Sequence, residues 1–399
     1  MSEKTGLEAW EEIVVEKMTG LSKPQAVLLA MWSFGIVITQ NCGLNTISIF
    51  LACLLDVKEG SIKQRLKEWY KESKAKKGEK RCELDVTLCF VPLIQWVLSW
   101  WSSDEKRIAL AMDASSLGKK FVVLAISIVY RSCAIPVAWI VLPEGKKGEW
   151  RPHWEGLFSH LQKAIPPDWT VIVLADRGLY ASWLFNCIKA NGWHPFLRVN
   201  HTYGTFSQPG KNQFLPLKMA LPQKGSSWSG QVTCFKSNPI NCTLLACWDE
   251  VHSDPWLILT DLPVNQADVF WYSLRPWIEC GFKQTKRSGW QWQRTRMTDP
   301  QRATRLWLAI ALATLWTLSV GGQAEDSLPA SSFDDLPLAH IARTFSPNPA
   351  FPHLVSCFRR GFLNILATLI ACKPIPLGTF RPLPWPSLDV DRFHFVDSS

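Results

Sequence analysis

Residues 169–178 read Trp-Thr-Val-Ile-Val-Leu-Ala-Asp-Arg-Gly, an apolar run that ends in an acid, a base and a glycine. A run of this kind, without alternating polar residues, is typical of a strand at the centre of a sheet that is covered on both faces. We therefore expect a buried strand over residues 169–175, with Asp176 at its carboxyl end. Buried central strands of this type occur in α/β proteins, so this stretch sets the class of fold.

Other periodic runs lie on both sides of this strand. They predict strands at 107–114, 121–130 and 133–142, a helix at 150–164, a helix at 180–190 and a strand at 195–199. The first three runs are separated by short polar connections, which indicate three consecutive antiparallel strands. Three strands, a helix, a strand, a helix and a strand predict an α/β sheet of the ribonuclease-H type.

The remaining chain suggests parts of different character. Short β-like runs punctuated by Gly, Pro, Ser and Asn indicate a β-rich insertion at about 200–254, followed by a core strand at 256–260 and a long helix from about Pro300 to Val320. The predicted division is a helical N-terminal region at 1–103, a core with the α/β sheet at 104–322 and a C-terminal tail with helices at 323–399.

The N-terminal region contains long apolar stretches between Leu21 and Leu55, which we expect to break at Gly35 and Gly43. A turn follows, and Ser61 is a candidate cap for a basic helix that extends to about residue 75. A helix, a short turn and a basic helix are typical of a helix-turn-helix DNA contact. The alternative is a solvated charged helix followed by a loop.

Composition favours a globular protein with an anionic partner. The formal net charge is +9, the sequence pI is near 8.9, and hydrophobic residues make up 47% of the chain. Nucleic acid is the first candidate for such a partner. Two apolar runs, at 26–39 and 306–320, are shorter than the roughly 20 residues that a membrane helix needs. We expect both to be buried helices of a soluble protein.

The twelve cysteines form no Cys-x2-Cys pair. The polar start Met-Ser-Glu-Lys-Thr does not resemble a signal peptide, so we expect reduced and mostly buried thiols. Cys242, Cys247 and His252 are close in sequence, but a tetrahedral zinc site needs a fourth ligand that the sequence does not place.

Three acids occupy distinctive positions: Asp113 in the first strand, Asp176 after the central strand, and Glu279 beyond the insertion. Carboxylates are the ligands that Mg²⁺ and Mn²⁺ prefer, and two such ions activate attack on a phosphodiester. Each acid also has a structural alternative: a turn residue, a helix cap and an ion-pair partner, respectively. Asp113 is the hardest to explain structurally, because an unpaired charge in an apolar strand is costly.

Glu279 lies in the segment Tyr-Ser-Leu-Arg-Pro-Trp-Ile-Glu-Cys-Gly-Phe-Lys-Gln-Thr-Lys at 272–286. At about 100° per residue on an α-helix, four of its polar side chains would share a wedge of about 60°. These are Tyr272, Arg275, Glu279 and Lys286. A carboxylate among groups that bind phosphate favours metal-dependent chemistry on a polyphosphate, and an intrahelical ion pair on a surface helix is the alternative.

The segment resembles the signature Tyr-x2-Arg-x3-Glu-x6-Lys of the IS-four family of bacterial insertion-sequence transposases, and every spacing matches. Ala-Met-Asp113 and Leu-Ala-Asp176-Arg-Gly, followed by Tyr180, are similar to the first and second acid motifs of that family. The resemblance extends over about residues 107–320 and includes the β-rich insertion before the glutamate.

The resemblance implies a DNA transposase with a ribonuclease-H-like core. Asp113, Asp176 and Glu279 would form a DDE triad that holds two Mg²⁺ or Mn²⁺ ions. The enzyme would cut the ends of its element by hydrolysis, and the freed 3′-hydroxyl would attack target DNA. The implied partners are the terminal inverted repeats, target DNA and further copies of the chain in a synaptic complex, with a cytoplasmic, nucleoid-associated location and no membrane.

The resemblance implies that Tyr272, Arg275 and Lys286 contact DNA near the element end, chiefly at phosphate, and Arg177 is a further candidate for DNA contact. A basic track interleaved with Trp290 and Trp292 is expected to bind the DNA backbone, with solvated surface as the alternative for part of it. The track consists of Lys283, Lys286, Arg287, Arg294, Arg296, Arg302 and Arg305. In relatives a Trp of the insertion holds a flipped base, and Trp228 and Trp248 are the candidates, with core packing as the alternative role.

Two features depart from the family pattern. Pro276 follows Arg275 directly, so the helix is expected to begin at Pro276, with Tyr272 and Arg275 on the segment that enters it. Cys280-Gly281 follows Glu279 where a further acid or a bulky residue is common. Two other functions stay open: a non-catalytic DNA-binding protein derived from a transposase, and a ribonuclease-H-fold nuclease without strand transfer.

Overall fold

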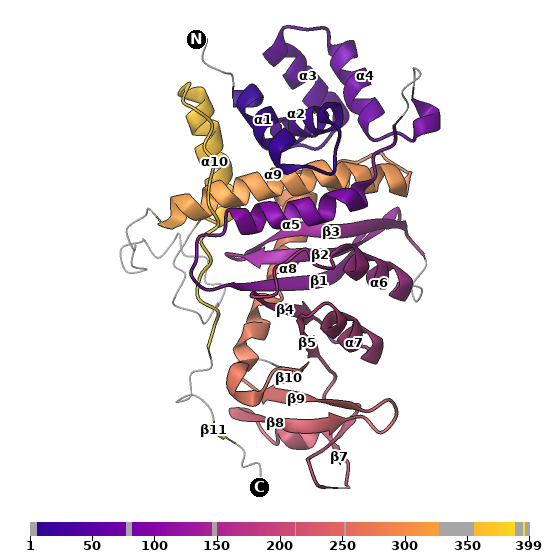
Figure 1. The fold of residues 1–399 in the computed structure, drawn as a ribbon, viewed down its shortest axis with the longest axis vertical. Coiled ribbons are helices and arrows are strands. Elements are labelled where there is room, and N and C mark those ends of the chain that lie inside the picture. The colour runs from indigo at the N-terminus through magenta and orange to yellow at the C-terminus, as the bar shows by residue number, and fades with distance from the viewer. Residues whose placement is uncertain are drawn as a thin grey trace.

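A mixed sheet runs through the protein, and helices from both ends of the chain pack together at one end of it (Figure 1). The computed structural model describes residues 6–76, 82–145, 150–211, 213–250, 253–326 and 355–387, together with the backbone of 394–395. The fold of these residues is mixed α/β.

The sheet has eleven strands in the described residues, in the order β3-β2-β1-β4-β5-β10-β9-β8-β6-β7, with β11 pairing beside β8. The strands are β1 (Arg107–Leu117), β2 (Phe121–Tyr130), β3 (Cys133–Pro143), β4 (Thr170–Ala175), β5 (His194–Arg198), β6 (Thr205–Ser207), β7 (Leu215–Pro216), β8 (Ser226–Cys234), β9 (Ile240–Cys247), β10 (Trp256–Thr260) and β11 (His394–Phe395).

The strands predicted around residues 169–178 are confirmed. β1, β2 and β3 pair antiparallel. β4 pairs parallel with β1 on one side and with β5 on the other, and it is buried from Val171 to Ala175. Two helices, α6 (Arg151–His160) and α7 (Ser182–Ala190), lie before and after β4 in the chain, where the sequence pattern predicts them.

The region predicted as a β-rich insertion extends the same sheet. β10 pairs antiparallel with β5 and with β9, and β9 continues to β8. Cys242 and Cys247 lie five residues apart on β9, so their side chains point to opposite faces of the sheet and cannot share a zinc ion. His252 lies outside the described residues. All twelve cysteines are free thiols, as expected, and seven of them are buried.

The N-terminal region is helical, with α1 (Gly6–Lys17), α2 (Lys23–Thr39), α3 (Leu44–Leu55), α4 (Glu59–Trp69), and α5 (Phe90–Ser99) preceded by the short 3₁₀ turns η1 (Ser73–Ala75) and η2 (Val86–Cys89). The expected break at Gly35 is wrong, because α2 continues through it. A Cβ at Gly35 would lie 2.5 Å from Cγ2 of Ile47, so the glycine allows α3 to pack closely on α2. The break at Gly43 is confirmed, since Gly43 is the N-cap of α3.

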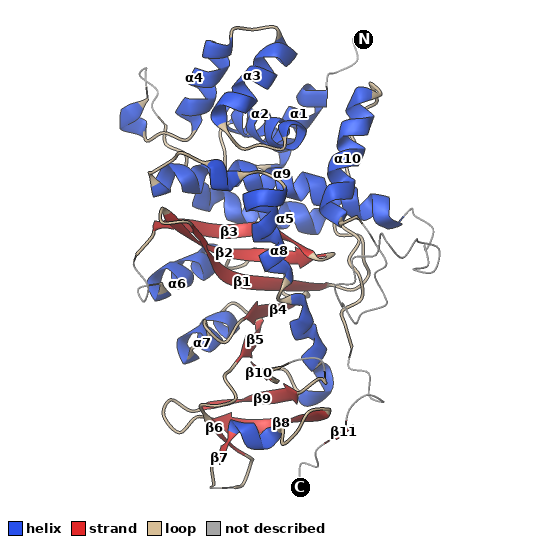
Figure 2. Ribbon diagram, turned by 180° about the vertical axis from the view of Figure 1, so that it is seen from behind, coloured by secondary structure: helices blue, strands red, loops and turns tan. Residues whose placement is uncertain are grey.

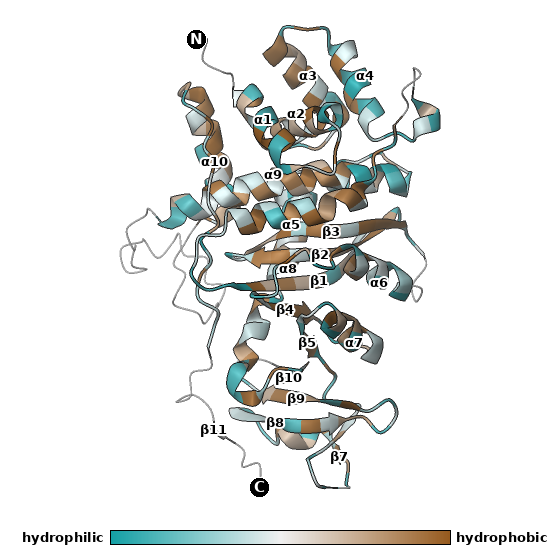
Figure 3. Cartoon of the chain, viewed as in Figure 1, coloured by the Kyte–Doolittle hydropathy of each residue, from teal (hydrophilic) through white to brown (hydrophobic). Residues whose placement is uncertain are grey.

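The basic helix begins earlier and ends earlier than predicted. Lys58 is the N-cap of α4, so Ser61 lies inside the helix and does not cap it. The helix buries Ile62, Leu66 and Trp69 and leaves its polar residues outside, which gives α4 its mixed colouring in Figure 3. The basic residues at 77–81 lie outside the described residues.

The long helix α9 (Pro300–Asp326) lies between the sheet and the helices of both ends of the chain. It contacts β3 on one side and the helices α2 and α10 (Cys357–Ile370) on the other. By length and composition α9 could cross a membrane, but its apolar stretch is fully buried inside the protein. The apolar run at 306–320 is therefore part of a buried core helix, and this helix is longer than the run predicts.

The C-terminal residues return to the sheet after α10. The amide of Ser102 donates to the carbonyl of Phe380, and Trp101 and Phe380 form a parallel β-bridge. Farther along, the ring of Trp385 packs against that of Trp271 at a centroid distance of 4.9 Å. The final described strand, β11, pairs with β8.

Candidate active site

The register of the parallel strands places Asp113 and Asp176 at the same level. The last paired residues of β1 and β4 are Ala111 and Leu174. Asp113 lies two residues beyond Ala111, and Asp176 lies two residues beyond Leu174. Because side chains alternate along a strand, both carboxylates leave the sheet on the face shared by these two residues. Asp113 is still inside β1, held by β2 at Ala125. Asp176 begins the turn after β4.

Glu279 comes from α8 (Trp277–Lys283), which packs across β1, β2 and β3 (Figure 2). Pro276 is the N-cap of this helix, as the departure from the family pattern predicts. Tyr272 lies in a preceding 3₁₀ helix, η5 (Val269–Leu274), and Lys286 lies in a following π-helix, η6 (Gln284–Ser288). The single α-helical wedge is therefore wrong, because three helix types with different turn angles make up the segment.

Arg275 connects two of the three acids. Its Nη2 lies 2.9 Å from Oδ2 of Asp113, and its Nη1 donates to Oε1 of Glu279. The intrahelical ion pair proposed as the alternative role for Glu279 does form. It is not a simple surface pair, however, because the Arg275 side chain is only 9% exposed and also binds an acid from β1.

Asp176 has its own set of partners. The hydroxyl of Tyr272 donates to its Oδ1 over 3.3 Å, and Nη1 of Arg198 lies 3.8 Å from the same oxygen. The backbone amide of Arg177 also donates to it, at 2.8 Å. No motif in the sequence singles out Arg198, but its position as the last residue of β5, beside β4, is the signal that could have identified it.

The electrostatics of Asp113 reflect these neighbours. Burial raises the pKa of Asp113, the Arg275 guanidinium lowers it, and the negative charges of Glu279 and Asp176 raise it further. The balance is an elevated pKa. The negative charges of Asp176 and Glu279 near Asp113 favour a positive charge at this place.

Lys286 reaches β1 beside Asp113. Its Nζ donates to Oγ of Ser115 and to the carbonyl of Ser116, each over 2.6 Å. Burial lowers the pKa of Lys286, and Arg287 adds to this effect. The wider turn of the π-helix carries the lysine to this position, and such turns occur frequently at functional sites.

Several of the other predicted DNA contacts are exposed side chains. Lys283, Arg287 and Arg177 are exposed, and Arg177 lies 3.5 Å from the carboxylate of Asp254. Arg294 and Arg296 of the basic track are exposed as well.

The end of the basic track is not a binding surface. Arg302 forms two hydrogen bonds with Glu72, and the buried Arg305 pairs with Glu83 and donates to the carbonyl of Tyr70. Trp290 and Trp292 are fully buried. The prediction that Arg302 and Arg305 belong to a DNA-binding track is therefore wrong, because their side chains join α9 to the N-terminal region. Trp290 packs against α9 and α10, and Trp292 packs against β2 and α9, so both rings belong to the core.

The tryptophan candidates for base stacking have different surroundings. Trp228 is buried in β8, with its ring 5.6 Å from that of Phe206, so its role here is core packing. Trp248 follows β9 and is partly buried against the core.

The donor set suits a hard divalent cation, because it consists of carboxylates. A cationic group already lies between Asp113 and Glu279, namely the guanidinium of Arg275. In this arrangement no three His, Cys, Asp or Glu side chains of the described residues are close enough together to hold a metal ion. The residue types at the site fit a divalent metal ion, and the guanidinium of Arg275 lies between two of the three acids.

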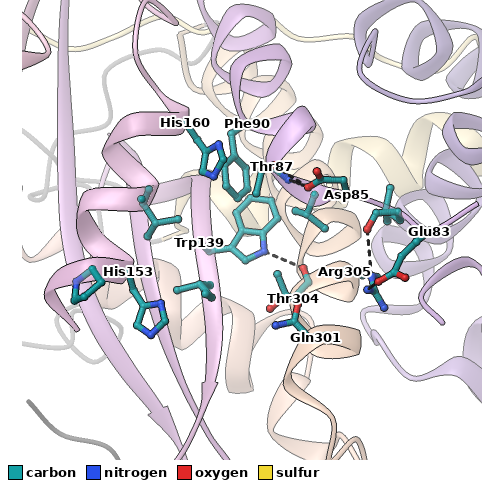
Figure 4. A pocket seen from close by; sticks show the side chains of 16 residues that line it. Glu83, Asp85, Thr87, Phe90, Trp139, His153, His160, Gln301, Thr304 and Arg305 are labelled. Atoms are coloured by element: carbon teal, nitrogen blue, oxygen red, sulfur yellow. Dashed lines mark hydrogen bonds and ion pairs between the residues drawn. The ribbon is translucent and has the colours of Figure 1, made fainter. Parts of the chain in front are cut away.

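A separate pocket of about 490 Å³ lies away from these acids, between η2, β3, α6 and α9 (Figure 4). Its walls include Trp139, His153 and His160, and Trp139 donates to the carbonyl of Thr304. None of the three acids lines it, so the candidate site is the place where the pairing of β1 with β4 ends, and not this pocket.

Comparison with known proteins agrees with the geometry. Residues 114–316, just over half of the chain, match a family model described as a transposase DDE domain. The match begins directly after Asp113 and includes Asp176 and Glu279. A comparison with curated proteins gives no match. The chain belongs to the transposase DDE domain family.

Proposed function

We propose that this protein is an active DNA transposase with a ribonuclease-H-like core, related to the IS-four family. It cuts the ends of its element and joins them to target DNA. The observation that carries the proposal is the register of β1 and β4, which brings Asp113 and Asp176 to one level of the sheet. Glu279 on α8 completes the set through its shared partner, Arg275.

Asp113, Asp176 and Glu279 would hold two Mg²⁺ or Mn²⁺ ions. Such ions, when bound, activate the attacking oxygen and stabilise the leaving oxygen of a phosphodiester. The protein supplies the geometry: β1 and β4 fix two acids through their backbone pairing, and α8 brings the third from a separate element. Tyr272 and Arg198 orient the carboxylate of Asp176.

DNA contacts would surround these acids. Lys283, Arg287 and Arg177 are exposed and available for phosphate, and Lys286 would bind phosphate next to Ser115. Tyr272 and Arg275 are engaged with the acids in this structure and would meet DNA at the cleavage point. The positive charges of Arg275, Lys286 and the three exposed basic residues favour a polyanion beside the acids.

The N-terminal region, 1–103, would bind the terminal inverted repeats. The residues 56–58 join α3 to α4, a connection of the length found in helix-turn-helix motifs. Lys58, Arg65 and Lys67 are exposed on or beside α4, while its apolar side packs inward. The division into this region, the core at 104–322 and the tail at 323–399 is part of the proposal.

Transposition requires two element ends in one complex, so we propose a homo-oligomer that acts in the cytoplasm at the nucleoid. Its partners would be element DNA and target DNA.

The test is Mg²⁺-dependent cleavage of duplex DNA that carries the element's ends. Asp113→Asn, Asp176→Asn and Glu279→Gln are each expected to reduce nicking to background, because each removes a charged ligand. The control is Asp168→Asn, which alters an exposed acid near the opposite end of β4 and should nick normally. Full nicking by any one triad variant would contradict the assignment of that residue.

A second assay separates the remaining functions. Pre-cut ends with a free 3′-hydroxyl are supplied with supercoiled target DNA, and joined products are expected. Nicking without joined product would indicate a nuclease. Binding of the ends without nicking or joining would indicate a DNA-binding protein derived from a transposase.

A further inference from the structure

Each of the three acids, Asp113, Asp176 and Glu279, is contacted by other side chains of the protein. Arg275 contacts both Asp113 and Glu279, while Asp176 accepts from Tyr272 and lies near Arg198. Asp113 and Glu279 come from different elements, and Arg275 is the direct link between them. One guanidinium group therefore lies between the two carboxylates.

Arg275 is not fully satisfied in this position. Its Nε is buried and has no hydrogen-bond partner within the described part of the chain. A buried donor without a partner costs free energy, which offsets part of the benefit of the two ion pairs. The hydrogen bonds and ion pairs of the guanidinium are therefore those to the two carboxylates.

We propose that Arg275 is an exchangeable counter-ion of the acidic centre: it bridges Asp113 and Glu279 in the metal-free protein and leaves when a divalent cation binds them. This inference rests on the proposed function. It explains why acids of suitable chemistry do not converge on a metal position in this structure. It also couples the two roles of the residue, because metal loading frees the guanidinium for a DNA phosphate.

The first experiment measures Mn²⁺ binding by electron paramagnetic resonance on the full chain without DNA. Arg275→Gln removes the competing charge and keeps similar bulk. The apparent affinity for Mn²⁺ is expected to rise by about tenfold, within the usual range for coupled binding events. Arg275→Lys keeps the charge but lacks the two-pronged geometry, so its affinity should lie between wild type and Arg275→Gln.

The matched control is Arg287→Gln, which removes one positive charge from the same segment without touching the acids. If loss of charge alone raised the affinity, both glutamine variants would bind Mn²⁺ more tightly to the same extent. Equal affinities for Arg275→Gln and Arg287→Gln, or weaker binding by Arg275→Gln in a folded protein, would overturn the inference.

A second readout follows the arginine itself. Phenylglyoxal modifies accessible guanidinium groups, and peptide mass spectrometry locates the modified residues. Arg275 is expected to be protected without metal and to react faster in Mn²⁺, whereas Arg287 should react equally in both conditions. Unchanged or greater protection of Arg275 in Mn²⁺ would also overturn the inference.

The two proposals fail in different ways. If neither wild type, Arg275→Gln nor Asp113→Asn binds Mn²⁺, the metal centre of the proposed function is wrong. If Mn²⁺ binds and Asp113→Asn abolishes binding, while Arg275→Gln behaves as Arg287→Gln does, the metal centre stands and the exchange is wrong.

Discussion

Gly281 sets how closely α8 approaches the sheet. A Cβ at this position would lie 2.8 Å from the Cβ of Ala134 in β3, closer than side chains tolerate. Glu279 is two residues earlier on the same helix, so the contact at Gly281 also sets how far this acid reaches toward β1. The small residue that departs from the family pattern thus has a packing role.

Gly281→Ala is expected to destabilise the protein. Overpacking costs about 1–3 kcal/mol, which exceeds the roughly 1 kcal/mol that alanine gains over glycine in a helix. Urea unfolding measures the change. Gly156→Ala in α6 is the control, because a Cβ there meets nothing within 4 Å and should stabilise the protein. A stability gain at Gly281 equal to that at Gly156 would contradict the close contact.

At the scale of elements, the strands could be predicted and the helical segment around Glu279 could not. A buried strand can be recognised locally, since every residue of β4 from Val171 to Ala175 is apolar. The switch from 3₁₀ to α to π turns depends on Pro276 and on packing against β1 and β3, which are distant in sequence. Asp113 and Asp176 could be identified because acids are rare in apolar strands and directly after them. Glu279 could be identified from its spacing to the neighbouring Tyr, Arg and Lys. Arg198 could not, because an arginine at the end of a strand is common.

The two arginines of α9 illustrate the same limit. Arg302 and Arg305 belong to a basic run in the sequence, but their partners Glu72 and Glu83 lie more than 200 residues earlier in the chain. A run of basic residues in the sequence does not show which acidic side chains they will pair with in the folded protein. Only the folded chain shows that these side chains join α9 to the N-terminal helices.

This junction predicts a pH-dependent stability. The hydrogen bond from Arg302 lowers the pKa of Glu72 from its ordinary 4.5 to about 2. Because the pKa of Glu72 is lower in the folded protein than in the unfolded chain, the ionised carboxylate stabilises the folded protein at pH values above about 4.5. This stabilisation is lost as the pH falls from about 4.5 to about 2. Because both side chains are about one-third exposed, Arg302→Gln should cost only about 0.5–1 kcal/mol at pH 7.

Urea unfolding of wild type and Arg302→Gln at pH 7, 5 and 3 measures this difference. The difference in the free energy of unfolding between the two proteins is expected to persist at pH 5 and to become smaller toward pH 3. Arg294→Gln serves as the control, because that side chain is exposed and should leave stability unchanged at each pH. A gap of constant size across the series would mean that Glu72 is not the partner that matters.

For the molecule as a whole, the C-terminal residues complete the core and do not lie loosely on it. α10 packs so closely on α9 that a Cβ at Gly361 would lie 1.8 Å from the carbonyl oxygen of Thr317. Tyr130 accepts a hydrogen bond from the amide of Arg381, and Arg131 binds Glu325 at the end of α9. The Pro-rich composition of this part of the chain gave no sign of these contacts, because they depend on close backbone approach and not on an apolar period.

Phe380 tests whether this closure stabilises the protein. Its side chain is fully buried, with its ring 5.3 Å from that of Tyr130 and 6.3 Å from that of Trp101. Phe380→Ala leaves a cavity where the C-terminal segment meets the sheet, so we expect a loss of about 3–5 kcal/mol in urea unfolding. Leu377→Ala, three residues earlier and 43% exposed, should change stability by less than about 0.5 kcal/mol. If both variants unfolded at the wild-type urea concentration, residues 371–387 would contribute little to the core, and the C-terminal segment could be removed without loss of the catalytic fold.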